Sequence, residues 1–102
     1  MSIVIAGRMP IKQESVEEAR EQGAALASKS REEAGCLDYR FGFDAEEPNV
    51  ALIQEHWESE DALNAHMGAA HFQAFTGFII GVVDGPVDLK RHEVTESRPL
   101  FG

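Results

Sequence analysis

The sequence is poor in cysteine, in basic residues and in long apolar runs. Cys36 is the only cysteine, so no disulfide can form within one chain, which suits a reducing compartment. Nine basic residues stand against 18 acidic ones, and a net charge of −9 would repel a polyanion, so we expect no nucleic-acid partner. No run reaches the roughly 18–20 apolar residues of a membrane span. The chain also lacks a basic start before a long apolar segment, so we expect no signal peptide, no membrane partner and a cytoplasmic protein.

What is present fits one folded domain over residues 1–102. The chain is 43% hydrophobic and 26% charged, which is typical of a globular protein and not of a disordered one. At this length we expect a single modest core, to which a second protein surface would add stability.

The apolar pattern predicts four strands and two helical regions. A capping box of Ser15 and Glu18 predicts a helix that begins there and ends at Gly35. Ser59 is the expected N-cap of the second helical region, which we expect Gly68 to interrupt. The strands are expected over 2–9, 37–44, 50–57 and 87–96, with Leu37, Tyr39, Phe41 and Phe43 on one face of the second. The order β-α-β-β-α-β predicts an α+β, ferredoxin-like split βαβ fold, an antiparallel sheet with helices on one face.

Both faces of the first expected strand are apolar. Ile3, Ile5 and Met9 alternate with Val4 and Ala6, so the helices can cover only one of the two sets. Because soluble proteins seldom leave a large apolar patch in water, we expect a homodimer joined through the sheet face.

The segment from Glu55 to Phe75 is the most informative for function. It contains the only tryptophan, Trp57, and three of the four histidines, beside apolar side chains. Titratable imidazoles next to an aromatic surface are typical of a small-molecule pocket.

This segment resembles the antibiotic biosynthesis monooxygenase domain. The resemblance is carried by Glu55-x-Trp57-x-Ser59-x-x-Ala62-Leu63-x-x-His66 with His71-Phe72 and Phe75, by Glu33–Tyr39, and by Gly85-Pro86-Val87. It covers about residues 2–96 and implies a dimeric α+β barrel that oxidises a quinol, polyphenol or anthrone with O₂, using no metal or flavin. Ile53 stands where the anthrone-oxidising members carry an asparagine, which disfavours the anthrone reaction itself.

The lead hypothesis is therefore a cofactor-independent monooxygenase of a small aromatic substrate, with His66 and Trp57 as catalytic residues. His66 would take or donate the phenol proton, and Trp57 would orient the ring. The expected substrate-binding residues are Tyr39, Glu55, His71, Phe72, Phe75 and Arg91. A phenol is a weaker acid than imidazolium by ~3.5 pKa units, roughly 5 kcal/mol, so a cation such as Arg40 or Arg91 would have to stabilise the phenolate.

Other interpretations stay open for the same residues. His66 can be a core histidine bonded to a carbonyl, Trp57 a core anchor, and Glu55 one half of a structural ion pair. His66 and His71 would lie about 140° apart on a continuous helix, so we expect no metal site. The alternative function is a non-catalytic dimeric domain that binds a small hydrophobic metabolite. Haem degradation is disfavoured, because haem-degrading relatives carry a second tryptophan where His66 stands.

Overall fold

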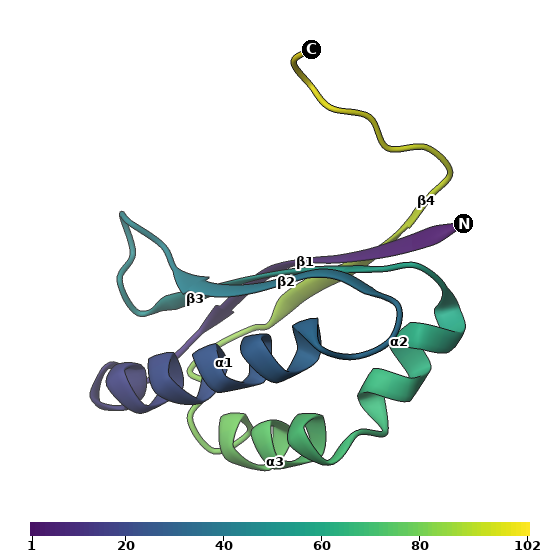
Figure 1. Ribbon diagram of the computed structural model, residues 1–102. Helices are drawn as coiled ribbons and strands as arrows, with labels where there is room; N and C mark the ends of the chain where they lie inside the picture. The colour runs from purple at the N-terminus through teal and green to yellow at the C-terminus, as the bar shows by residue number, and fades with distance from the viewer.

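The computed structural model describes residues 1–102 and contains one antiparallel sheet with three α-helices on one face (Figure 1). The sheet order is β2-β3-β1-β4, which is the predicted ferredoxin-like arrangement. The elements in chain order are β1 (Ser2–Pro10), the 3₁₀ turn η1 (Gln13–Ser15), α1 (Val16–Arg31), β2 (Cys36–Phe43), β3 (Val50–Trp57), α2 (Glu60–Met67), α3 (Ala70–Ile79) and β4 (Asp88–Val94).

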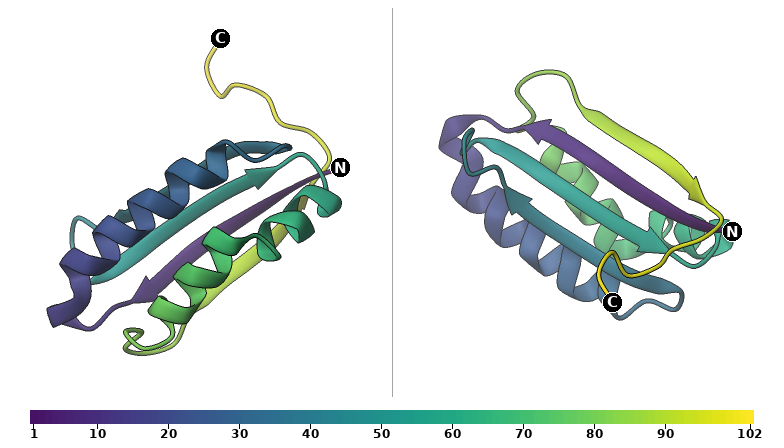
Figure 2. Two further views of the ribbon diagram at one scale, coloured as in Figure 1. Left: turned by 60° about the horizontal axis from the view of Figure 1, so that its bottom comes forward. Right: turned by 90° about the horizontal axis from the view of Figure 1, so that it is seen from above.

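The alternation of β3 decides which side chains face the helices. Ala51, Ile53, Glu55 and Trp57 are buried, whereas Leu52 and Gln54 are exposed on the opposite face. Since successive strand residues point to opposite sides, the buried set lies beneath the helices, where the hydrophobic core is formed. Figure 2 shows the two faces in turn, with the helices in front of the sheet in one view and the uncovered face in the other.

The helix α1 begins after Ser15 as predicted, but without the expected side-chain cap. Ser15 makes no side-chain bond to the helix, so the expected capping box is wrong, and the turn η1 leads into α1 instead. Further along, Gly23 packs closely against Phe41 of β2. A Cβ atom at this position would lie only 2.2 Å from a carbon of the Phe41 ring. The small residue therefore lets α1 pack directly on the sheet.

The start of β2 also departs from a simple alternation. The pairing with β3 shifts between Cys36 and Asp38, which places Cys36 opposite Trp57. Leu37 is consequently exposed, and the prediction that it shares a face with Tyr39 is wrong. A bulge adds one residue to a strand and so reverses the facing of the residues before it.

The predicted interruption of the second helical region is confirmed. The Ser59 hydroxyl accepts a hydrogen bond from the backbone N–H of Ala62 at 3.1 Å and caps α2, which ends at Gly68 before α3 begins. None of the helices has the length and apolar character needed to cross a membrane.

The uncovered face of the sheet is mixed in character. Leu52 is exposed there beside Gln54, and the partly buried Val4 and Ala6 lie on the same face. Beyond β4 the chain runs away from the body on the side opposite the helices (Figure 1). Its apolar residues Leu100 and Phe101 are exposed.

Candidate functional site

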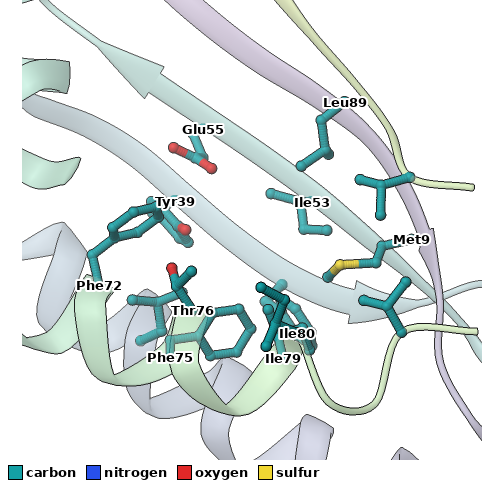
Figure 3. Close-up of a pocket in the computed structure, with 14 residues that line it drawn as sticks. Met9, Tyr39, Ile53, Glu55, Phe72, Phe75, Thr76, Ile79, Ile80 and Leu89 are labelled. Atoms are coloured by element: carbon teal, nitrogen blue, oxygen red, sulfur yellow. The ribbon is translucent and has the colours of Figure 1, made fainter.

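A cavity of about 440 Å³ lies between the sheet and the helices (Figure 3). Its 14 lining residues come from the four strands, α1, α3 and the segment that follows α3, and 12 of them are hydrophobic. The volume falls within the roughly 300–1,000 Å³ range of small-molecule sites. Only Glu55 and Thr76 bring markedly polar side chains to it, so the cavity suits a largely apolar guest with one polar group.

Glu55 is the ionisable group of this wall. It lies two residues before Trp57 on β3, so both side chains point to the helix side, and the indole Nε1–H donates to Glu55 Oε1 at 3.0 Å. Tyr39 stands opposite Glu55 in the pairing of β2 with β3, so its phenol lies beside the carboxylate. Burial raises the pKa of Glu55, although the hydrogen bond from Trp57 and the neighbouring Tyr39 phenol oppose the rise. Burial likewise raises the pKa of Tyr39, with the Glu55 charge adding to the shift.

The raised pKa of Glu55 predicts how stability depends on pH. Because the pKa of Glu55 is higher in the folded protein than in the unfolded one, the protonated carboxyl adds to the free energy of unfolding below pH 4.5, its ordinary pKa. This stabilisation is lost as the pH rises through the pKa of the folded state. Glu55→Gln should therefore gain stability relative to the wild type as pH rises from about 4.5 toward 8. Urea unfolding of both proteins across this range measures the difference, and a difference that stays constant or falls would contradict it.

Trp57 and His66 lie behind the cavity wall. Their exposed fractions are 0% and 1%, and their ring centroids are 4.6 Å apart at an angle of 35°. Neither residue lines the cavity, although the sequence predicted that both act on the substrate. The physical reason is that α2 packs His66 onto the indole, and Tyr39 and Phe72 close around the imidazole at centroid distances of 5.3 and 4.9 Å.

A second polar group forms where the three helices meet. His66 Nδ1 and His71 Nε2 lie 2.6 and 2.7 Å from the same oxygen, Glu33 Oε2. Because a carboxylate can only accept, both nitrogens carry hydrogen and donate to it. The prediction that His66 and His71 point apart is wrong, since α2 and α3 are separate helices and the 140° estimate assumed a continuous one.

The structure thus brings part of the expected site together. Tyr39, Glu55, Phe72 and Phe75 line the cavity, whereas His71 does not. The sequence pattern did not predict a functional role for Glu33. This residue comes next to His66 and His71 only because α1 packs near α2 and α3. The pattern also missed Thr76, the second polar group on the wall.

Neither expected arginine faces the cavity. Arg91 pairs with Glu60 at the start of α2 at 2.8 Å and lies outside the cavity lining, so its contact with a substrate stays a prediction. Arg40 pairs with Asp38 at 2.8 Å. Both guanidinium groups are held by carboxylates close in space, which is an ordinary arrangement for surface arginines.

Cys36 is predicted to be an unreactive thiol. Burial, with the negative charges of Glu33 and Glu55, raises its pKa from 9.0 to about 11. The thiolate fraction near pH 8 is then about a hundredfold below that of a free thiol, and alkylation should slow accordingly. Labelling by iodoacetamide at pH 8, compared with glutathione and with the urea-unfolded protein, measures this. A native rate close to the unfolded rate would contradict it.

The fold and the cavity together define a ferredoxin-like α+β domain with a largely apolar hollow between sheet and helices, and known proteins are similar to it in sequence. A profile of the antibiotic biosynthesis monooxygenase family matches residues 2–77. The Bacillus subtilis protein named "Putative monooxygenase YcnE" is 31% identical over 94 residues, 92% of this chain and 99% of that protein. "Uncharacterized protein sll1783" of Synechocystis is 30% identical over 98 residues, 96% of this chain and 67% of that protein.

The fold is shared more widely than the sequence. The structure of Rv0793 from Mycobacterium tuberculosis matches with a TM-score of 0.88 at 18% identity, covering 97% of this chain and 100% of that one. The chain belongs to the antibiotic biosynthesis monooxygenase family. Membership supports a monooxygenase-like role at the level of the family.

Proposed function

We propose that the protein is a cofactor-independent monooxygenase that oxidises a small quinol or polyphenol with O₂ in the cavity between sheet and helices. The observation that carries the proposal is the carboxylate of Glu55 on a largely apolar wall, where the indole N–H of Trp57 donates to it. A flat aromatic ring fits the apolar part of the cavity, and its hydroxyl would donate to this carboxylate.

In the proposed reaction the substrate supplies the electrons. The phenol proton passes to Glu55 while one electron passes to O₂, which leaves a phenoxyl radical and superoxide. These combine at a ring carbon that carries hydrogen, ortho to the phenoxyl oxygen, and Glu55 returns its proton to form a hydroperoxide. The O–O bond then breaks as the same ring carbon loses its hydrogen, so that water leaves and a hydroxylated quinone remains. One oxygen atom becomes the new carbonyl, and the other leaves as water with two hydrogens.

The energetics favour moving the proton and the electron together. A phenol and an ordinary glutamic acid differ by ~5.7 pKa units, roughly 8 kcal/mol, so Glu55 would hold little free phenolate. Burial raises the pKa of Glu55 and narrows this gap, but no cationic side chain lines the cavity to stabilise an anion. Transfer of the electron to O₂ as the proton leaves avoids the free anion.

The other expected site residues act around Glu55 in this proposal. Tyr39, Phe72 and Phe75 form the wall against which the ring lies. Trp57 and His66 are positioning residues, because the indole N–H orients the carboxylate and the imidazole packs on the indole. His71 holds His66 through Glu33.

Oxygen uptake with a panel of hydroquinones tests the proposal. We expect saturable uptake above autoxidation for at least one of them, with one O₂ consumed per hydroxylated quinone formed. Saturable binding without turnover of any of them would instead support a non-catalytic domain that binds a hydrophobic metabolite.

We further propose that the protein is cytoplasmic and forms a homodimer through the uncovered face of the sheet. Leu52 on that face and the exposed Leu100 and Phe101 of the C-terminal segment are the apolar groups that a second copy would cover. Sedimentation velocity at micromolar concentration should give a dimer, and Leu52→Glu should shift it toward the monomer, whereas Glu21→Lys on α1 should not. A stable wild-type monomer would remove the proposal.

A further inference from the structure

The ends of three helices bring two imidazoles and one carboxylate together outside the cavity. Glu33 follows α1, His66 lies in the last turn of α2 and His71 in the first turn of α3, and their three ligand atoms lie within 4.8 Å of one another. We propose that this group, the Glu33 cluster, binds one divalent transition-metal ion of the zinc type. The site lies outside the cavity, since none of its three residues lines it.

The donor set matches the chemistry of zinc. Three protein ligands drawn from histidine and carboxylate, with water in the fourth position, form a common tetrahedral zinc site. His66 supplies a buried anchor at 1% exposure, whereas the side chains of Glu33 and His71 are 17% and 22% exposed. The open side of the cluster is therefore the side on which a water ligand and the entering ion would approach.

A tetrahedral ion would require the three side chains to shift from their present positions. Bonds of about 2.0–2.2 Å to a tetrahedral ion place neighbouring ligand atoms about 3.4 Å apart. The two nitrogens lie 2.6 and 2.7 Å from Glu33 Oε2, so the carboxylate would withdraw by roughly 0.7 Å. The two nitrogens lie within 4.8 Å of each other, so they would approach by at most about 1.4 Å. Glu33 lies beyond the last residue of α1 and is partly exposed, which leaves its side chain room to move.

A second observation comes from the other nitrogen of His66. Nε2 is buried and has no hydrogen-bond partner, and the rings of Trp57, Tyr39 and Phe72 surround the imidazole. With Nδ1–H donating to Glu33, a neutral imidazole presents a bare lone pair to these rings, which is unfavourable. A metal on Nδ1 moves the hydrogen to Nε2, and an N–H directed at an aromatic ring is weakly favourable. Metal binding therefore removes an unsatisfied buried acceptor.

A bound metal ion would also connect the end of α1 to α2 and α3 through its ligands. Because the folded arrangement alone brings the ligands together, the free energy of binding adds to the free energy of unfolding. At a hundredfold excess over Kd the melting temperature should rise by about 10 °C or more.

Titration of untagged, chelator-treated protein with Zn²⁺ or Co²⁺ tests the site. We expect one ion per chain, a visible absorption band typical of tetrahedral Co²⁺, and the rise in melting temperature. His71→Ala should weaken binding at least tenfold, since even outer-shell changes commonly cost about tenfold. His92→Ala, which removes an exposed histidine of β4, is the matched control and should bind like the wild type.

Glu33→Gln keeps a hydrogen-bond acceptor for His66 but removes the negative charge. This variant should therefore also bind the metal ion at least tenfold more weakly than the wild type. Absence of binding at 100-fold molar excess of ion would overturn the proposal. Equal affinities of the wild type, His71→Ala and Glu33→Gln would overturn it as well, because binding would then lie elsewhere on this acidic surface.

Discussion

Glu55→Gln is expected to lower kcat for quinol oxidation at least a hundredfold while the protein stays folded. Glutamine keeps an oxygen that accepts the Trp57 N–H, so the wall of the cavity should retain its shape. It cannot take a proton from the substrate, and a positioned general base contributes about 10²–10⁴ in rate. Oxygen uptake under saturating hydroquinone, with the far-ultraviolet circular dichroism spectrum as a check on folding, measures the loss.

Glu21→Gln is the matched control for this result. Glu21 is an exposed carboxylate of α1, so the same chemical change there should leave the rate unchanged. If a folded Glu55→Gln protein kept the wild-type kcat, the proton would have to leave by another group, and the assignment of Glu55 as the proton acceptor would be abandoned.

Trp57→Ala is expected to reduce the free energy of unfolding by about 3–5 kcal/mol, the usual range for deleting a buried large aromatic side chain. The indole is fully buried, contacts the His66 ring and meets Tyr39 edge to face at 6.2 Å. Its removal also leaves the buried Glu55 carboxylate without one of its donors, which adds to the cost. Because small domains are commonly stable by only about 5–15 kcal/mol, the variant should be marginal.

Trp57→Phe separates packing from hydrogen bonding. It retains most of the apolar ring but loses the N–H, so its cost should be about 1–3 kcal/mol, that of an unsatisfied buried polar group. Guanidinium unfolding followed by circular dichroism compares the three proteins without relying on tryptophan fluorescence. A loss below about 1 kcal/mol for Trp57→Ala would show that the indole is not a core anchor.

Local pattern explains why much of the fold is predictable. The alternation of β3 correctly places Ile53, Glu55 and Trp57 on one face, and Ser59 correctly marks the start of α2. These features depend on residues within a few positions of one another. The bulge at Leu37 is not visible in the same way, because the extra residue is decided by pairing with β3.

The sequence by itself determined the family, the order of the strands and helices, and the presence of aromatic and titratable groups around Trp57. Only the tertiary structure decided that the indole and the imidazole face each other behind the wall, that Glu55 faces the cavity beside Tyr39, and that Glu33 joins His66 to His71. The physical reason is sequence distance. The facing of a residue along one strand follows from its neighbours, but a contact between residues more than 30 positions apart depends on how α1, α2 and α3 pack against one sheet.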